Sequence, residues 1–324
     1  MKKIIALLYF FFWAFLCHAE DNRLFVRKLK KENLTFVPQI HHSSSVDRVA
    51  WSPSGRFLAS ASEQGAVKIW DTKENLLFHT VRNRGPSVKS LIWSPNGRWL
   101  SWSDDSVSAP VVVWNLRKRK PYALITKEVW KRKGLQGLRC RFGAYSLSWS
   151  SDSQILAWIG RSSLCDERTI RGSDANRSFL VKEYYDDVQF WSAKKKRIDF
   201  TLFSKLHQEI GAIQWKPKSK KIALGRKREI HIFSTKERRV TQTYSFNKPS
   251  AVVDRLSWSG TGEFLAASND IFLSVFDILK KRVVYKRKIN SSSGGSLQFV
   301  GGEKYIAWTT LRLSLIHISE PTRR

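Results

Sequence analysis

Few residues of this chain have the types and spacing of catalytic residues or metal ligands. His41 and His42 are adjacent at the end of an expected strand, where neighbouring side chains point to opposite faces, so they make a poor metal-binding pair. Asp186 and Asp187 are better explained as residues at the entry of a strand than as the paired carboxylates of a glycosidase. No G-x-S-x-G elbow, P-loop or H-E-x-x-H motif occurs in the 324 residues. The sequence therefore predicts no catalytic residue, no bound metal and no cofactor.

The pattern that does recur is a tryptophan at the end of a short apolar segment. Its copies lie 42, 56, 66, 43 and 41 residues apart, and the sixth carries a phenylalanine: Trp51, Trp93, Trp149, Trp215, Trp258 and Phe299. A period near forty residues, with strand–turn–strand content in every copy, is typical of a β-propeller. The indoles are better explained as packing between blades than as a ligand cage. We therefore predict an all-β propeller of four-stranded antiparallel blades. Six blades are detectable and seven are expected in the natural protein, with a six-bladed ring as the alternative.

The first copy divides into four strands by its alternating apolar residues and its turn residues. These strands are expected at Val46–Trp51, Phe57–Ser62, Ala66–Asp71 and Leu76–Val81. Residues 24–40 repeat the pattern of a third strand followed by an outer strand. Because an open ring leaves unpaired sheet edges, we expect these N-terminal strands to complete the last blade.

The repeats resemble the WD-repeat family and its exported bacterial relatives over residues 24–312. Trp70-Asp71 is the only WD pair, and other pairs replace it in later copies: Trp114-Asn115, Trp191-Ser192, Phe233-Ser234 and Phe276-Asp277. No Gly-His pair precedes a blade, so the structural tetrad of that family is incomplete. The resemblance implies partner contacts where the innermost strands begin, at Asp47, Arg48, Lys89, Tyr145, Asp254 and Arg255. Local ion pairs are the alternative explanation of the two Asp-Arg pairs.

Basic charge dominates the chain and recurs at one position of the repeat. Lys and Arg total 57 against 27 Asp and Glu, a formal net charge of +30. In a four-stranded meander the first and third turns of every blade lie on one face of the ring. The third turns hold these basic residues: Arg117, Lys118, Arg119, Lys120, Lys194, Lys195, Lys196, Arg197, Arg238, Arg239, Lys280, Lys281 and Arg282. We interpret them as a docking surface for an anionic partner, with solvated turns as the alternative.

Both ends of the chain carry segments that we exclude from the fold. Lys2 and Lys3, an apolar run to Leu16 and then Ala19 are typical of a signal peptide over residues 1–19, with an uncleaved anchor as the alternative. The segment LSLIHISEPTR, from Leu313, resembles a translated sequencing adapter, although its alternation also suits a strand. We therefore expect one propeller domain over residues 20–312, incomplete at its C-terminus, a non-native tail over 313–324, and a periplasmic or secreted protein.

The two long steps between repeats place insertions on the face opposite the basic turns. One insertion lies between blades two and three (residues 126–143), the other lies in the second turn of blade three (161–186), and each contains one cysteine. Two cysteines in an oxidising compartment are a candidate bridge, so we predict a disulfide between Cys140 and Cys165. Loops on a rigid scaffold often carry function, and disordered decoration is the alternative.

These features favour an exported, non-enzymatic, monomeric scaffold that binds a protein or an anionic envelope polymer, with no stable membrane span after signal cleavage. An enzyme with a site at the channel mouth, a hydrolase or lyase acting on an anionic glycan, is the first alternative. Nucleic-acid binding through the basic turns is the second. It lacks the interleaved exposed aromatic residues that single-strand binding uses.

Overall fold

The computed structural model describes residues 42–82, 87–104, 111–125, 139–166, 185–203, 209–246, 252–269, 271–289, 297–300, 305–308 and 317–319. The regular elements in these ranges are all β-strands, and none of the ranges holds a helix long and apolar enough to cross a membrane. The predicted signal segment and the predicted strands within residues 24–40 lie outside the described ranges.

The first three sheets are antiparallel meanders of four strands each. The first sheet contains β1 (Val46–Trp51), β2 (Phe57–Ser62), β3 (Ala66–Asp71) and β4 (Leu76–Arg82). The second contains β5 (Val88–Trp93), β6 (Trp99–Asp104), β7 (Val111–Asn115) and β8 (Lys120–Ile125). The third contains β9 (Arg139–Trp149), β10 (Ile155–Asp166), β11 (Tyr185–Ser192) and β12 (Arg197–Phe203).

Two further meanders and a shorter sheet follow. The fourth sheet contains β13 (Ile210–Trp215), β14 (Lys221–Arg226), β15 (Glu229–Ser234) and β16 (Arg239–Ser245). The fifth contains β17 (Arg255–Trp258), β18 (Phe264–Ser268), β19 (Phe272–Asp277) and β20 (Arg282–Lys288). The sixth contains β21 (Leu297–Val300), β22 (Tyr305–Trp308) and β23 (His317–Ser319). β23 lies in the segment from Leu313 onwards, for which a strand was the alternative interpretation, and it pairs with β22.

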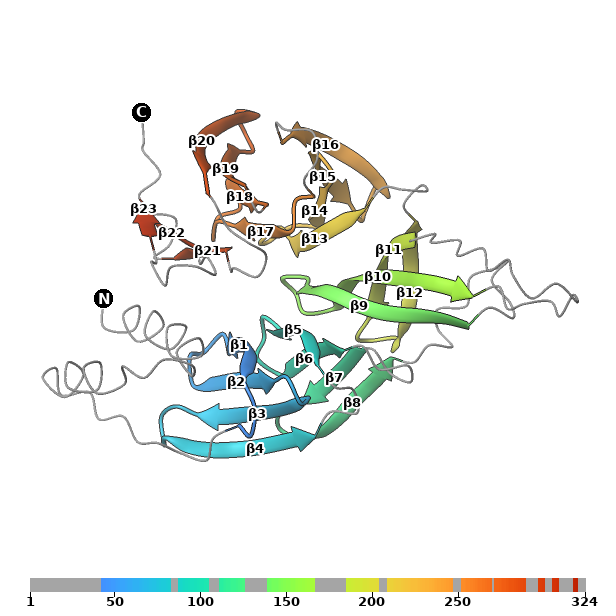
Figure 1. Ribbon diagram of the computed structural model, residues 1–324, viewed down its shortest axis with the longest axis vertical. Coiled ribbons are helices and arrows are strands. Elements are labelled where there is room, and N and C mark those ends of the chain that lie inside the picture. The colour runs from blue at the N-terminus through green and yellow to red at the C-terminus, as the bar shows by residue number, and fades with distance from the viewer. Residues whose placement is uncertain are drawn as a thin grey trace, which may run out of the picture.

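The six sheets are arranged around a common centre, with the first strand of each sheet innermost (Figure 1). These first strands contact one another in chain order, from β1 through β5, β9, β13 and β17 to β21. Such radial stacking of antiparallel meanders confirms the predicted β-propeller. The strands of the first blade have the predicted bounds, except that Arg82 extends β4 by one residue. The predicted N-terminal closure of the ring falls on residues outside the described ranges, and the number of blades in the natural protein stays a prediction.

The third turn has the same construction in all five complete blades. An oxygen-bearing side chain at the end of the third strand accepts a backbone N–H from within the turn, and this residue is Asp71, Asn115, Ser192, Ser234 or Asp277. The residues that replace the aspartate of the WD pair therefore still accept the hydrogen bond that closes the turn. The residue just before the outer strand has a φ between 50° and 54°, and it is Asn75, Arg119, Lys196, Arg238 or Lys281. Four blades thus place a basic residue in the left-handed region, where glycine or asparagine is more favourable.

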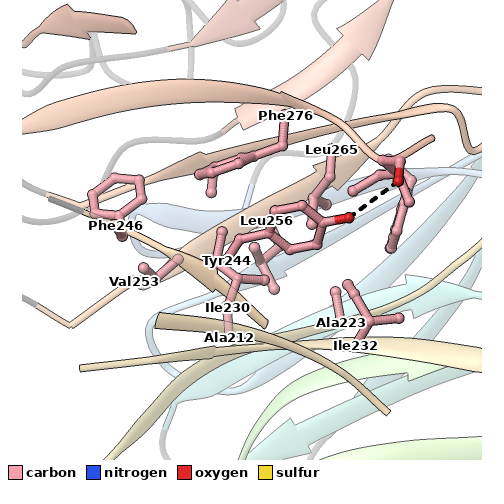
Figure 2. Packing of buried hydrophobic residues seen from close by; sticks show 13 residues of the cluster. Ala212, Ala223, Ile230, Ile232, Tyr244, Phe246, Val253, Leu256, Leu265 and Phe276 are labelled. Carbon is pink, nitrogen blue, oxygen red and sulfur yellow. Dashed lines mark hydrogen bonds between the residues drawn. The ribbon is translucent and has the colours of Figure 1, made fainter. Parts of the chain in front are cut away.

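The hydrophobic core lies between neighbouring blades. Figure 2 shows the cluster in which side chains of the fourth blade meet those of the fifth. Phe276 is 1% exposed there, and Tyr244 donates its hydroxyl to the carbonyl of Ile278 at 3.2 Å across the interface. Complete burial of one large apolar side chain contributes roughly 1.5–3 kcal/mol. Apolar contact therefore holds each blade against the next and fixes the orientation of its turns.

The two predicted insertions are partly strand. β9 already begins at Arg139 and β10 continues to Asp166, and these two residues are paired across the hairpin. The prediction that residues 139–143 and 161–166 are loop is therefore wrong. Adjacent antiparallel chains satisfy each other's backbone groups, so the ladder continues beyond the other blades as long as the two chains run side by side. The insertions do leave from neighbouring points, as predicted.

Candidate functional site

Four of the recurring tryptophans lie between blades, as predicted: Trp93, Trp149, Trp215 and Trp258. The indole N–H of Trp93 donates to the carbonyl of Ala50 at 2.9 Å, and that of Trp258 donates to the carbonyl of Gln214 at 3.1 Å. Both indoles are almost fully buried. They therefore fix each blade to the one before it and are not exposed as a ligand cage.

The first strands of blades two to six surround a cavity of about 410 Å³. Its polar lining comes from β5, β9, β13 and β17 together with the residue before β17: Ser90, Ser146, Ser148, Gln214, Asp254 and Arg255. The rest of the lining is largely apolar and includes Trp93 and Trp149. This cavity is the central channel in which some propellers place a site.

Most of these polar side chains bind the backbone of the following blade. Ser90 Oγ accepts the N–H of Leu147 at 3.2 Å, and Ser148 Oγ accepts that of Trp215 at 2.9 Å. Further round the ring, Gln214 Oε1 accepts the N–H of Trp258 at 2.9 Å. Ser146 repeats the pattern in spite of a φ of 49°, by accepting the N–H of Ile213 at 3.0 Å. The channel wall is therefore a chain of inter-blade hydrogen bonds.

The two Asp-Arg pairs differ in their contacts. Arg255 Nη1 lies 3.0 Å from Asp254 Oδ1, and the side chain of Arg255 is only 14% exposed. Asp254 and Arg255 therefore form a local ion pair beside the channel. Arg48 instead donates to two backbone carbonyls, that of Lys89 in the next blade at 3.0 Å and that of Asp47 at 2.8 Å. Arg48 thus links the first strands of blades one and two at the rim.

Tyr145 lies inside a strand and not at its beginning. The sequence predicted that Tyr145 begins an innermost strand, but β9 already begins at Arg139, because the hairpin is longer there. Its ring lies over Gly143, where an added Cβ would be 2.7 Å from Tyr145 Cε2. Tyr145 also packs, half-buried, against the cluster between blades three and four. Tyr145 therefore packs at the base of the long hairpin, and its contact with a partner stays a prediction.

A hydrogen-bonded chain in the first blade was not predicted from the sequence. Ser60 Oγ accepts the indole N–H of Trp70 at 2.9 Å and lies 2.7 Å from His42 Nε2. Burial, with a smaller contribution from Lys68, lowers the pKa of His42 to about 4, so the ring is neutral and Nε2 can accept the serine proton. Trp70, Ser60 and His42 therefore form one hydrogen-bonded chain between β3, β2 and the residues before β1. Ser60, ten residues before Trp70, was the feature of the sequence from which this chain could have been predicted.

The third turns are exposed, as their charge predicts. Some of their cations have a local partner. Arg119 lies 4.4 Å from the ring centroid of Phe78, Lys196 lies 4.6 Å from that of Tyr122, and Arg238 lies 5.4 Å from that of Phe200. Each of these rings belongs to the outer strand of the preceding blade. The αL cation of blades two, three and four therefore also clamps two blades together.

Two more cations of the third turns are paired with carboxylates. Lys195 lies 2.8 Å from Asp199, and Arg239 lies 2.6 Å from Glu237. The others have exposed side chains with no ion pair or ring contact among the described residues, and we call them the basic face: Arg117, Lys118, Lys120, Lys194, Arg197, Lys236, Lys280, Lys281 and Arg282.

The backbone places the two predicted disulfide partners opposite each other. Cys140 in β9 is paired with Cys165 in β10, next to an irregularity in the register. Directly opposed residues of antiparallel strands have Cα atoms about 4.5–5.5 Å apart, within the range that a disulfide spans. The backbone register therefore suits the predicted bridge, which stays a prediction.

One family model matches part of the sequence. Residues 16–96 match the model of the anaphase-promoting complex subunit 4 WD40 domain. No curated protein sequence matches the chain.

Solved structures match a much larger part of the chain. The structure of U3-55K has a TM-score of 0.59 at 12% identity and covers 84% of this chain and 76% of its own. The RRP9 WD40 repeats have a TM-score of 0.60 at 12% identity, with coverage of 84% and 75%. Hydrazine synthase of Kuenenia stuttgartiensis has a TM-score of 0.63 at 11% identity, with coverage of 85% and 83%. At these identities the likeness concerns the fold alone, which is that of a WD40-type β-propeller.

Proposed function

We propose that this protein is an exported, non-enzymatic scaffold that binds a protein partner at its channel-mouth face. This face carries the second turns, the connections between blades, and the residues Asp47, Arg48, Lys89, Asp254 and Arg255. WD40 propellers typically act as protein-interaction scaffolds, which supports a binding role for a chain with the same fold.

The proposal rests mainly on the polar side chains around the channel, which are engaged in hydrogen bonds between blades. Ser90, Ser148 and Gln214 each accept a backbone N–H from the next blade. A nucleophile needs a base within hydrogen-bond reach. None of these serines is bonded to a histidine or a carboxylate in the part of the chain that the structure describes. The channel wall thus supports a rigid platform better than a catalytic centre.

The long hairpin of the third blade supports the choice of face. β9 and β10 extend past the other blades on the side where the innermost strands begin. The rim residue Asp47 is exposed on that same side, at the beginning of β1. A partner seated over the channel mouth would contact both the rim and the side of this hairpin. Binding residues are commonly held on such projections from a rigid scaffold.

The place of action follows from the N-terminal segment. Lys2, Lys3, the apolar run and Ala19 have the pattern of a cleaved signal, so we place the mature protein in the periplasm or outside the cell. The partner would then be a protein of that compartment.

Charge reversal on the two faces of one blade tests the proposal. Asp47→Lys changes the rim of the channel-mouth face, and Glu74→Lys makes the same charge change in the third turn of the same blade. We expect Asp47→Lys to reduce co-purification of the partner from an envelope extract, whereas Glu74→Lys leaves it unchanged. Equal effects of the two variants contradict the choice of face. Sustained product release from anionic polysaccharides by the purified protein contradicts the non-enzymatic role.

A further inference from the structure

Exposed aliphatic side chains accompany the basic turns of the fourth and fifth blades. Leu279 is 71% exposed, and it occupies the turn position at which the other complete blades have Lys73, Arg117, Lys194 or Lys236. Val283, 47% exposed, follows Arg282 directly. In the fourth blade, Val240 is 40% exposed and follows Arg239. The fifth blade therefore presents the exposed run Leu-Lys-Lys-Arg-Val.

The cations of that run are available to an external partner. The side chains of Lys280, Lys281 and Arg282 form no ion pair among the described residues. Cations interspersed with exposed aliphatic side chains match the boundary between phosphate headgroups and acyl chains. A purely electrostatic partner would leave the aliphatic side chains in water.

The aromatic rings beside the basic turns argue against a nucleic acid as the partner. Phe78, Tyr122 and Phe200 are each covered by a cation of the following blade. None of the three is an exposed platform for base stacking, which contributes most of the sequence-independent affinity for single strands.

The distribution of charge favours a planar anionic surface over a linear polyanion as the partner. The basic face has members in the turns of blades two, three, four and five, so its charges are spread around the ring. A linear polyanion could follow only part of that ring at one time, whereas a planar surface meets all of these turns together.

We propose that the basic face docks onto the surface of an anionic lipid bilayer. Leu279 and Val283 enter the headgroup region, and Lys280, Lys281 and Arg282 lie beside lipid phosphates. The channel-mouth face then points away from the membrane. This proposal uses a different face from the proposed protein-binding function, and either can fail without the other.

Sedimentation with lipid vesicles tests it. The probes are vesicles of phosphatidylcholine alone and of phosphatidylcholine mixed with phosphatidylglycerol. Each basic residue near an anionic surface contributes about fivefold in partitioning, so Lys280→Glu with Lys281→Glu lowers binding to the anionic vesicles by roughly 30-fold or more. The matched control, Lys227→Glu with Lys288→Glu, makes the same charge change at the opposite ends of the strands and leaves binding within about threefold. Thermal unfolding of all variants shows whether each one is folded.

A second variant pair tests the contribution of the aliphatic residues. Leu279→Ser weakens binding to the anionic vesicles, and the difference persists at high salt, where the charge contribution is screened. Leu124→Ser, on the exposed outer strand of the second blade, leaves binding unchanged. All variants are purified from the exported fraction in the same way, so the comparisons concern proteins that have been processed alike at the N-terminus.

Three results overturn the proposal. The first is equal binding of the native protein to neutral and anionic vesicles. The second is an equal loss of binding in the two double variants. The third is binding to heparin or duplex DNA without binding to anionic vesicles, which would assign the basic face to a polymer.

Discussion

The guanidinium of Arg119 lies 4.4 Å from the ring centroid of Phe78, which belongs to the outer strand of the preceding blade. Arg119 holds a φ of 50° in the third turn. The same residue therefore occupies an unfavourable backbone region and makes a contact between blades. Lys196 with Tyr122 and Arg238 with Phe200 repeat the arrangement. Part of the basic charge on this face is thus structural.

Removal of this clamp should have a small, measurable cost. We expect Arg119→Ala to lower the free energy of unfolding by about 0.5–1 kcal/mol through loss of the cation–π contact. A double-mutant cycle with Phe78→Leu in urea unfolding isolates that contact from other effects. Lys118→Ala, one residue away and without a ring contact, should stay within about 0.5 kcal/mol of the native protein. A coupling energy of zero between Arg119 and Phe78 contradicts the clamp.

Gly225 allows the connection between blades four and five to pack against β14. A Cβ at Gly225 would lie 2.6 Å from the carbonyl oxygen of Val253. We expect Gly225→Ala to destabilise the protein by about 1–3 kcal/mol, because backbone must move to make room. Gly260→Ala is the control, since a Cβ there meets nothing within 4 Å. Similar melting temperatures for the two variants would show that this connection is not held as described.

Substitution of Ser148 tests whether the hydrogen bonds of the channel wall stabilise the protein. Ser148→Ala leaves the N–H of Trp215 without its acceptor inside the protein, at a cost of about 1–3 kcal/mol. Ser54→Ala, in an exposed first turn, should change the urea midpoint little. If the two serine variants unfold at the same urea concentration, the inter-blade bond does not stabilise the ring.

His42 should make stability depend on pH. Its pKa in the folded protein is about 4, lowered from 6.5. The unfolded chain then takes up the proton more readily, so stability is lost as the pH falls from about 6.5 through about 4. His42→Gln removes this titration. The difference in melting temperature between the native protein and the variant should therefore become smaller as the pH falls from about 6.5 to about 4. A constant difference contradicts a buried, neutral His42.

The predicted disulfide can be tested without knowing the function. We expect the exported protein to contain a Cys140–Cys165 bridge, detected by mass spectrometry after alkylation with and without prior reduction. Cys140→Ser should then leave Cys165 reactive. Full alkylation of both cysteines in the unreduced native protein is the result that rejects the bridge.

Repetition explains what could be predicted from the sequence. The strand positions of the first blade follow from strict apolar alternation between glycine- and serine-containing turns, and β1, β2 and β3 have the predicted bounds. The basic third turns follow from the same register. The position of Asp71 holds asparagine or serine in other blades, and each of these side chains also accepts a backbone N–H of the third turn. Because the residue type differs between blades, this shared role became visible only in the structure.

Contacts between segments without a local pattern could not be predicted. The extension of β9 and β10 depends on two insertions pairing with each other, and neither one alone shows a strand of that length. The bond between His42 and Ser60 joins residues 18 positions apart and depends on the path of the chain before β1. The use of Ser90, Ser148 and Gln214 as inter-blade acceptors depends on the stagger between first strands, which periodicity does not encode.

Site-specific photocross-linking in the native envelope identifies the face that binds a protein. A photoreactive residue at position 89 lies on the channel-mouth face, and one at position 194 lies on the basic face. If the partner binds at the channel-mouth face, position 89 gives a discrete protein adduct and position 194 gives none of that size. Protein adducts from position 194 alone would show that the partner binds the basic face instead.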